Sequence, residues 1–528
     1  MWSFALAVGC GEDPETSTTP PTTSTEATCD DGLPVASFQP GPYGTGLYAL
    51  ADDVALDLRD GTRYVRSERW DGCESLLFVP SRPTQEGGNP FALWSRDLEE
   101  LLRALPRHTR LFFVSNAPSD GEAEAELAQL DTDLAAAFDA LGANKREQLD
   151  GRVHVVAGRA GSLGSWVDAP LTDPGFGFGV DRTQHIRWIG SFADGDRYDS
   201  GMGWFQSNVS FAANEAVAWD AEAKRDHRVA GWGATRVRAF DSLLIEDPGW
   251  TGAHTTAVID VPDDLERYDA LDLELTLDCV GEGEVGECPA WDYLVYARLC
   301  EAEDDASCPT ELGRWITTYH REGRWLVDAS HLLPLLHAGE RRAITFESIQ
   351  PYEVTLDLLF HDDEDEALRP LAVTPLFTGG SLNPTYNEAH PPVTVDVPAD
   401  AERVELVVLV TGHGGEPPWN CAEFCVTDHH FGVGGVDHAI SLSDAGSSTG
   451  CQEQLGDGTV PNQFGTWFYG RSNWCPGKQV DPIRVDVTGE VTPGSSVEIT
   501  YEALFRGDDY PGSAANIVLS SWLVSWGA

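Results

Sequence analysis

The sequence contains short stretches in which a charged residue, an aromatic residue and a cysteine stand together. In GECPAWDYLVYARLC (286–300), Asp292 lies between Trp291 and Tyr293 at the start of an apolar run that is typical of a buried strand. Strands disfavour aspartate, and a carboxylate at such a place usually only ends the preceding turn. Between two large aromatic residues, however, the carboxylate would be partly desolvated. That environment suits a carboxylate that takes or gives a proton during a reaction.

Two later stretches repeat this combination. In TGHGGEPPWNCAEFC, Glu423 stands beside Phe424 inside the five-residue loop Cys421–Cys425, and in GRSNWCPG the residues Arg471 and Trp474 precede another cysteine. If the two cysteines of the first loop pair, the small ring holds Glu423 at a fixed point and angle. Solvated loop charges beside structural disulfides are the plainer interpretation. Structural cysteines alone would not require charged companions, so we expect a functional site.

The chain of 528 residues is too long for one hydrophobic core and predicts about three domains. After an unstructured start, the region 35–200 alternates apolar runs of strand length with runs of helical spacing. Strands are expected at 75–80, 110–115 and 152–157, helices at about 98–105 and 127–141, and a hairpin follows at 178–190. This β-α-β-α-β-β order predicts a thioredoxin-like α/β domain. It lacks a CxxC motif, so we assign it no redox chemistry, and 201–235 is expected to be a linker.

Beyond residue 236 the helical periodicity disappears. Short alternating runs separated by Gly, Pro and Asp turns are typical of strands in a sandwich or jelly roll. The polar stretch TGGSLNPTYNEAHPP interrupts this pattern, and a second all-β block runs to LSSWLVSW near the C-terminus. The sequence therefore predicts a mainly β protein with two tandem jelly-roll or β-sandwich domains, at 236–380 and 381–528.

The amino-acid composition limits the kinds of molecule that the protein is expected to bind. The chain has 34 Lys and Arg residues against 86 Asp and Glu residues, a net charge of −52. Such a field repels phosphate backbones and anionic lipids, so we expect no nucleic-acid binding and no electrostatic membrane binding. The acidic residues are spread along the chain and 41% of residues are hydrophobic. This pattern favours an acidic soluble surface rather than a disordered polyanion.

The N-terminus and the cysteines indicate export. Residues 1–10, MWSFALAVGC, are similar to the end of a bacterial lipoprotein signal, in which Cys10 would carry the lipid, although a basic region is missing and an accidental apolar start is the alternative. The Ser/Thr/Pro-rich segment 11–34 reads as a tether. Apart from Cys10 there are ten cysteines, with no CxxC pair and no zinc-finger spacing, so disulfides are favoured over metal sites. We expect an exported protein: an outer-membrane lipoprotein, or one at the cell surface or secreted.

Taken together and in order, the motifs of about residues 235–528 resemble peptide:N-glycosidase F, a bacterial amidase with two jelly-roll domains that removes N-linked glycans from asparagine. The resemblance is carried by TRVRAFDSLLI, CPAWD, ELGRWITTY, ITFES, the GHG…CAEFC loop, RSNWCPG and LSSWLVSW. It implies that Asp292 is the principal catalytic aspartate, that Glu423 assists it, and that Glu347 is a third acidic residue in the cleft. It also implies that Trp291, Arg471 and Trp474 line the glycan site.

The resemblance further implies three disulfides, Cys279–Cys288, Cys421–Cys425 and Cys451–Cys475. The pairs Cys300–Cys308 and Cys29–Cys73 would be additions.

Three positions depart from the best-known family member, and they bear on the glycan that is accepted. Tyr293 stands in place of an arginine, Ile349 in place of a cleft tryptophan, and Phe424 in place of a tryptophan within the small loop. We count Tyr293 and Phe424 among the expected substrate-binding residues.

The implied chemistry needs no metal and no cofactor. Hydrolysis of the amide between GlcNAc and asparagine requires an activated water and a proton for the departing glycosylamine, and two carboxylates in unlike environments can divide this work. Arg471 could steady a developing negative oxygen, and Trp291 and Trp474 could offer apolar faces to sugar C–H groups. The expected partners are N-glycosylated proteins or glycopeptides, bound by a monomer whose only membrane contact is the lipid anchor.

Other functions remain as alternatives. A glycan-binding surface protein with a degenerate amidase cleft is favoured by Tyr293 and Ile349. A copper monooxygenase of similar double-sandwich build could use His413, His429, His430 and His438, but the only methionines, Met1 and Met202, lie outside the sandwiches. Adjacent histidines on a strand point to opposite faces, which favours a packing or surface role for His429 and His430. A purely structural adhesin would leave the charged stretches unexplained.

Overall fold

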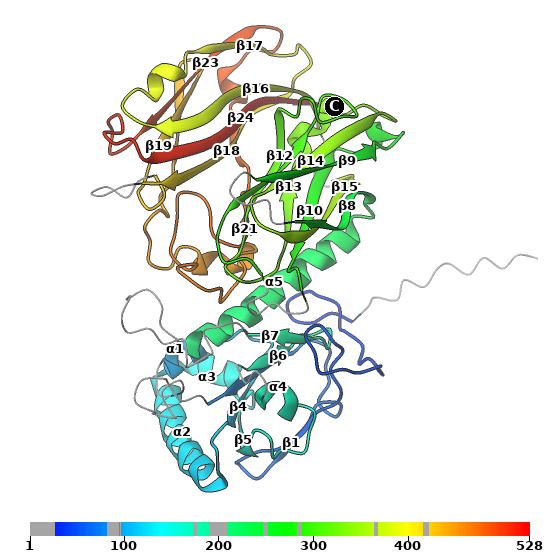
Figure 1. The fold of residues 1–528 in the computed structure, drawn as a ribbon, viewed down its shortest axis with the longest axis vertical. Coiled ribbons are helices and arrows are strands. Elements are labelled where there is room, and N and C mark those ends of the chain that lie inside the picture. The colour runs from blue at the N-terminus through cyan, green and yellow to red at the C-terminus, as the bar shows by residue number, and fades with distance from the viewer. Residues whose placement is uncertain are drawn as a thin grey trace, which may run out of the picture.

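The computed structural model describes residues 27–81, 94, 97–172, 177–189, 209–246, 252–281, 288–363, 368–415 and 422–528. These residues form an N-terminal part with a mixed sheet and helices, followed by two β-sandwiches (Figure 1). The expected lipidation site Cys10 and the cysteine at 421 lie outside the described residues. Within the described ranges, none of the helices has both the length and the apolar character of a membrane span.

The N-terminal part is built on a five-stranded sheet in the order β5-β4-β3-β6-β7. Strands β3, β4 and β5 run parallel, and β6 and β7 form an antiparallel hairpin beside β3. The expected strands and the hairpin are therefore present, while the thioredoxin-like classification stays a prediction. The strands are β1 (Ala55–Asp57), β2 (Arg63–Val65), β3 (Ser75–Pro80), β4 (Thr109–Ser115), β5 (Val153–Arg159), β6 (Phe178–Val180) and β7 (Ile186–Trp188).

Alternate residues of β3 and β4 enter two different cores. Leu77 and Phe113 pack under the helices α1, α2 and α5, whereas Phe78 and Phe112 face α4 and the segment that contains β1 and β2. Because both faces of these strands are covered, their sequences are continuously apolar. The helices are α1 (Leu98–Ala104), α2 (Asp120–Ala140), α3 (Ala143–Leu149), α4 (Asp168–Thr172), η3 (Val209–Phe211) and α5 (Ala212–Gly231).

Helix α5 corrects the expected linker over 201–235. It is a 20-residue helix, and its first half is buried in the N-terminal core through Ala212, Ala213, Ala216 and Trp219. Alanine has the highest helix propensity, and its small side chain lets the helix lie close to the sheet. The second half of α5 extends toward the first sandwich (Figure 1).

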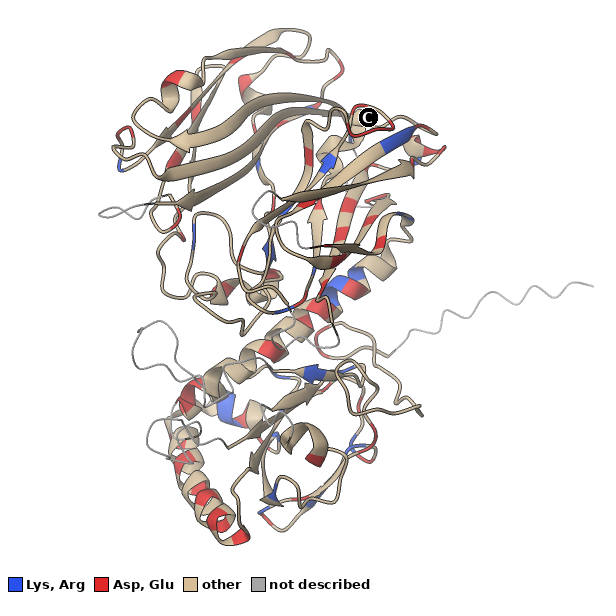
Figure 2. Cartoon of the chain, in the orientation of Figure 1, with Lys and Arg blue, Asp and Glu red and all other residues tan. Residues whose placement is uncertain are grey.

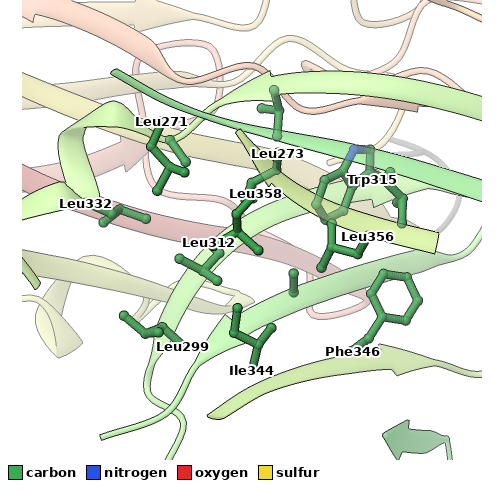
Figure 3. Close-up of a cluster of buried hydrophobic side chains, with 14 of the residues drawn as sticks. Leu271, Leu273, Leu299, Leu312, Trp315, Leu332, Ile344, Phe346, Leu356 and Leu358 are labelled. Carbon is green, nitrogen blue, oxygen red and sulfur yellow. The ribbon is translucent and has the colours of Figure 1, made fainter. Parts of the chain in front are cut away.

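The first sandwich has a four-stranded sheet in the order β13-β10-β15-β8 and a five-stranded sheet in the order β21-β12-β11-β14-β9. Their facing side chains form one core that includes Leu273, Trp315 and Leu356 (Figure 3). The strands are β8 (Thr235–Ile245), β9 (Ala253–Asp260), β10 (Ala270–Asp278), β11 (Leu294–Leu299), β12 (Thr310–Ile316), β13 (Gly323–Asp328), β14 (Arg341–Ser348), β15 (Tyr352–His361) and β21 (Lys478–Gln479).

The second sandwich consists of two four-stranded sheets, β16-β24-β18-β22 and β17-β23-β19-β20. The boundary expected at residue 380 is too late, because β16 is already part of this sandwich through its pairing with β24. Conversely, β21 comes from the range expected for the second domain but pairs with β12 of the first sandwich. The strands are β16 (Arg369–Leu382), β17 (Val393–Asp396), β18 (Arg403–Gly414), β19 (Asp428–Val433), β20 (Val436–Ser441), β22 (Ile483–Asp486), β23 (Ser496–Leu504) and β24 (Ala515–Gly527).

The sheet that contains β18 and β24 is buried on both faces, and this joins the sandwiches. Leu406 and Val408 enter the core of the second sandwich, while Val407 and Leu409 between them enter the core of the first. Successive side chains of a strand point to opposite faces, so the run VELVVLV is apolar throughout except for its glutamate.

A buried ion pair on β12 also makes hydrogen bonds across the junction between the sandwiches. Arg314 of β12 is fully buried and binds Glu311 through Nε and Nη2, while its Nη1 donates to Thr411 Oγ1 at 2.8 Å and to the Val518 carbonyl at 2.9 Å. A buried guanidinium is stable only when its donors are satisfied. The two sandwiches are thereby held in one arrangement.

Four expected disulfides are confirmed: Cys29–Cys73, Cys279–Cys288, Cys300–Cys308 and Cys451–Cys475. Cys425 is also disulfide-bonded, although its expected partner at 421 lies outside the described ranges. Disulfides of this number are typical of exported proteins. Figure 2 marks Asp and Glu residues in red along the ribbon of all three parts of the molecule.

Candidate active site

The candidate site lies around Arg471. Its Nη2 is 3.5 Å from Asp292 Oδ2, and its Nε is 3.5 Å from Glu423 Oε1. Nε and Nη2 form one edge of the planar guanidinium, so both carboxyl groups address the same edge. The Arg471 side chain is only 1% exposed, whereas those of Asp292 and Glu423 are 15% and 24% exposed. The structure therefore brings together three residues that the sequence analysis selected from separate stretches.

The guanidinium is fixed from its other sides. Nη1 donates to the carbonyls of Thr466 and Tyr469, at 3.1 and 2.9 Å, and Nη2 donates to Thr466 Oγ1 at 3.0 Å. Its central carbon lies 5.2 Å from the ring of Phe424 and 4.9 Å from that of Trp474, within the range of cation–π attraction. Arg471 is therefore held in place before any substrate binds, and its charge is aimed at the two carboxyl groups.

Asp292 stands on a turn that precedes β11, and Thr317 holds this turn on both sides. Thr317 Oγ1 donates to the Trp291 carbonyl at 2.7 Å and accepts from the Tyr293 backbone N–H at 2.8 Å. The Thr317 N–H donates to the Tyr293 carbonyl, also at 2.8 Å. The aspartate is thus presented by a short segment whose flanking peptide groups are fixed. This turn, which ends just before the strand begins, explains the unusual position of an Asp between two aromatic residues.

Tyr319 is a further member of the site. Its hydroxyl group is hydrogen-bonded to the Asp292 carboxylate and lies 3.4 Å from Arg471 Nη2. Burial, together with the negative charge of Asp292, raises the pKa of Tyr319 above its ordinary value, so the phenol stays protonated and donates. Sequence reasoning missed this residue because TTYH reads as the end of an apolar strand.

The segment 422–425 places Glu423 at Nε of Arg471, whose Nη2 faces Asp292. The backbone N–H of Glu423 donates to the Gly414 carbonyl at 3.0 Å, and the Ser472 N–H donates to the Glu423 carbonyl at 2.9 Å. The Glu423 carboxylate also accepts from the Gly414 N–H at 3.4 Å. Since Ser472 directly follows Arg471, these contacts tie the glutamate to the arginine that it faces.

Burial raises the pKa of both carboxyl groups, but their charged and hydrogen-bonding neighbours differ. Burial raises the pKa of Asp292, and the Arg471 charge and the Tyr319 hydroxyl only partly offset this effect. Burial also raises the pKa of Glu423, the charge of Asp292 raises it further, and Arg471 opposes both. A group whose pKa is raised toward neutrality can take up or release a proton at working pH.

The expected aromatic residues differ in exposure. Trp291 is 58% exposed and presents an open face, whereas Trp474 is 5% exposed. The indole N–H of Trp474 donates to the Gly412 carbonyl at 2.8 Å, and its ring stacks on His413 with centroids 5.0 Å apart. Trp474 therefore supports Arg471 and offers no open face to a sugar. Tyr293 and Phe424 are both half-buried beside the charged residues.

Glu347 lies away from Arg471, in the five-stranded sheet of the first sandwich. It is on β14 opposite Tyr296 of β11, its side chain is 41% exposed, and its carboxylate lies 3.0 Å from Arg298 Nε. No contact between Glu347 and the Asp292, Arg471 and Glu423 side chains is found among the described residues. The expected third acid is thus on the sheet that leads to the site, with its own cationic partner.

The histidines have packing roles. Burial lowers the pKa of His413 to about 3, so it stays neutral beneath Trp474, and its Nε2 lies 2.8 Å from Thr411 Oγ1. His429 is buried, with Nδ1 2.9 Å from the Tyr501 hydroxyl, and His430 pairs with Asp437. Within the described ranges, no three His, Cys, Asp or Glu side chains gather as metal ligands.

The arrangement has the parts needed for hydrolysis of a neutral amide or ester. It offers two carboxyl groups with raised pKa values, a preorganised cation between them and an exposed indole beside them. The carboxyl groups can exchange protons with water and a leaving group, and the cation can stabilise negative charge that develops on a carbonyl oxygen.

Comparison with known proteins gives a family match within the second sandwich. Residues 381–524 match the family described as peptide-N-glycosidase F, C terminal. Among solved structures, the chain is similar to a peptide-N(4)-(N-acetyl-beta-D-glucosaminyl) asparagine amidase, with 18% identity, a TM-score of 0.44, and 56% of this chain and 96% of that chain covered. PNGase F from Flavobacterium meningosepticum gives 18% identity, a TM-score of 0.43 and the same coverage. PNGF-II gives 14% identity, a TM-score of 0.42, and 66% and 74% coverage. No curated protein matched the sequence.

Proposed function

We propose that this chain, whose residues 381–524 match the C-terminal domain of peptide-N-glycosidase F, is a peptide-N-glycosidase. It hydrolyses the amide bond between the GlcNAc of an N-linked glycan and asparagine, and leaves aspartate in the protein. One observation carries the proposal: Asp292 and Glu423 address the same edge of the buried Arg471, each at 3.5 Å.

In the proposed reaction, Asp292 as carboxylate accepts a proton from the attacking water. The water oxygen bonds to the amide carbon, and negative charge develops on the former carbonyl oxygen. Arg471 stabilises this charge, because its cation is fixed before the reaction and is shielded from solvent. The carbon–nitrogen bond then breaks, and the glycosylamine leaves with a proton that Glu423 supplies in its protonated form.

The substrate lies beside the exposed Trp291, which offers an apolar face to the C–H groups of a sugar ring. Tyr293 and Phe424 border this face from the turn and the cystine loop. Glu347, at some remove and paired with Arg298, contacts more distant hydroxyl groups of the glycan. The contribution of Trp474 to binding is indirect, through the orientation of Arg471.

The substrates are N-glycosylated proteins or glycopeptides that the protein meets outside the cytoplasm. The disulfides support this location, since such bonds persist in oxidising compartments. We further propose that the protein acts as a monomer, anchored by lipid at Cys10.

The test is incubation of the full chain with a denatured N-glycoprotein in water enriched in ¹⁸O. The proposal predicts release of intact glycan and conversion of the glycosylated asparagine into aspartate that carries one ¹⁸O atom. Two results would contradict it: glycan bound without release, as expected of a glycan-binding protein, or cleavage that leaves a GlcNAc on asparagine, as expected of a glycosidase.

A further inference from the structure

The N-terminal part, to which the sequence assigned no chemistry, packs against the segment that carries the site. Tyr319, Leu455 and Trp467 form a small buried cluster, and Phe211 and Val217 of the N-terminal part pack on it. Trp467 is fully buried and lies four residues before Arg471. Its neighbour Thr466 is the residue that binds two nitrogens of Arg471. The N-terminal part therefore contacts the segment that fixes the guanidinium.

Asn462 makes buried polar contacts between the N-terminal part and this segment. Its side chain is completely buried. Its Nδ2 donates to the Ile189 carbonyl at 3.0 Å and to the Phe211 carbonyl at 2.8 Å, and its Oδ1 accepts from Asn214 Nδ2 at 3.1 Å. The backbone of Asn462 has φ of 48°, a left-handed conformation that asparagine tolerates better than most residues. The segment thus makes its turn where the N-terminal part binds it.

The next residue, Gln463, connects this segment to Tyr319 of the site. It is also completely buried. Its Oε1 accepts from the Tyr319 N–H at 2.9 Å, and its Nε2 donates to the carbonyls of Val460 and Pro476, each at 2.7 Å. The hydroxyl group of the same Tyr319 accepts from Arg471 Nη2 at 3.4 Å, and this nitrogen lies 3.5 Å from Asp292 Oδ2. The Tyr319 hydroxyl group also interacts with the Asp292 carboxylate. Buried hydrogen bonds of Asn462, Gln463 and Tyr319, joined by the covalent chain between and within these residues, therefore connect the N-terminal part to the site.

A buried ion pair runs beside these hydrogen bonds. Glu215 of α5 binds Arg321 with Oε1 to Nη1 at 2.6 Å, and both side chains are at most 7% exposed. Arg321 Nη1 also donates to the Pro461 carbonyl. Breaking a buried pair leaves an uncompensated charge and is strongly unfavourable. The ion pair fixes α5 against the residues that flank Tyr319 and Asn462.

From these contacts we infer that the N-terminal part is a positioning element of the candidate site, acting through Asn462, Gln463 and Tyr319 on Asp292. The inference deepens the proposed function and rests on it for its catalytic meaning. Tyr319 is the last of these three residues. A shift of its hydroxyl group by about 1 Å would remove its hydrogen bond to the aspartate, and displacements of that size cost about 10²-fold in rate.

Two variants of the full chain test this inference. Asn462→Gly removes the side chain and keeps the left-handed backbone, and Asn214→Ala removes the partner on the N-terminal side. Arg225→Gln is the matched control. It breaks the contact of Arg225 Nη1 with the Arg324 carbonyl at 2.6 Å, which joins the same helix to the first sandwich without involving residues 461–469.

Two measurements report on the positioning of Asp292 and do not depend on catalytic activity. The first is hydrogen exchange of peptides from 461–475, and the second is the pKa of Asp292, followed by carboxyl ¹³C NMR. We expect about tenfold faster exchange and a higher Asp292 pKa in Asn462→Gly and Asn214→Ala, because the Tyr319 hydrogen bond that favours the carboxylate is weakened. Arg225→Gln should change neither. Glycan release should fall about tenfold in kcat with little change in KM.

The outcomes separate the inference from the proposed function. Unchanged exchange and an unchanged Asp292 pKa in both variants would overturn the inference, even if the wild-type protein released glycans. If the wild-type protein releases no glycan but both physical readouts move as expected, the proposed function fails and the positioning of Asp292 stands. Should Asn462→Gly not fold, Asn214→Ala alone decides the matter, since alanine keeps the helix at the junction intact.

Discussion

Arg471 and Asp292 are 179 residues apart in the sequence, yet Arg471 Nη2 lies 3.5 Å from Asp292 Oδ2. The arginine comes from the loop before β21 and the aspartate from the turn before β11, so the contact joins segments that lie far apart along the chain. Arg471 is more buried than either carboxyl group that it faces. The arginine is therefore held inside the protein, whereas the two carboxyl groups are accessible to a substrate.

The first prediction concerns the shape of this cation. Arg471→Lys keeps the charge but loses the planar guanidinium, which binds Thr466 and Tyr469 while it faces both carboxyl groups. We expect kcat for glycan release to fall about 10²-fold, the loss typical of one preorganised stabilising group. Steady-state kinetics on a glycopeptide measures this effect. A kcat close to the wild-type value would show that a positive charge suffices.

The second prediction concerns stability and pH. The pKa of Glu423 is raised by burial above its ordinary value of 4.5, so the folded protein holds this proton more tightly than the unfolded chain. Stability is then lost as the pH rises through the raised pKa, and Glu423→Gln, which cannot ionise, escapes this loss. We expect the variant to match the wild-type protein well below the ordinary pKa and to melt at a higher temperature at neutral pH.

Thermal melting over this pH range measures the difference. Glu498→Gln, at an exposed position on β23, is the control for the effect of a Glu to Gln substitution as such. A Glu423→Gln protein that is less stable than wild type at neutral pH would mean that Arg471 outweighs burial.

The third prediction separates the two tryptophans. Trp291→Ala removes an exposed side chain, so the free energy of unfolding should change by less than about 0.5 kcal/mol while KM for the glycopeptide rises. Trp474→Ala removes a buried ring between Arg471 and His413 and should cost about 3–5 kcal/mol of stability. Denaturant unfolding and kinetics of both variants measure this contrast. Equal effects on stability would contradict the different roles.

The fourth prediction concerns Thr317, which the sequence analysis did not select. Thr317→Val has nearly the same shape but loses the hydroxyl bonds on either side of Asp292. We expect about a tenfold fall in kcat with little change in KM, and recovery of most of the activity in Thr317→Ser. Thr345→Val, at another buried threonine of the same sandwich, is the control and should keep full activity. Failure of serine to restore kcat would point to packing rather than hydrogen bonding.

The residues that carry charge could be selected from the sequence, because each stands in an unusual local setting. Asp292 interrupts an apolar run, Glu423 lies within a small cysteine loop, and Arg471 lies close to a cysteine and a tryptophan. These three residues come together only because the two sandwiches pack against each other, and no local sequence pattern predicts that packing. Thr317 and Tyr319 were missed because their roles arise from partners far along the chain, while their own segment reads as an ordinary strand end.

The strands beyond residue 236 could be predicted from alternation and turn residues, and the pairs in four disulfides agree with the expected ones. Helix α5 was missed, although the composition of AANEAVAWDAEAKRDHRVAG is rich in strong helix formers and could have revealed it. Its apolar side chains are mostly alanines, which give a weak amphipathic signal. The boundary near residue 380 was misplaced because β16, which belongs to the second sandwich, begins before the polar stretch and runs into its first residues.

The fifth prediction tests the central claim that Asp292 acts in the reaction. Asp292→Asn keeps the size of the side chain and removes its negative charge, while Thr317 still holds the turn. The measurement is glycan release from a denatured N-glycoprotein by the purified full chain, with glycan binding and folding checked on the same sample. We predict a folded protein that binds glycan normally and releases it at least about 10²-fold more slowly. Release at a near-normal rate would contradict it and would leave Asp292 as a turn residue.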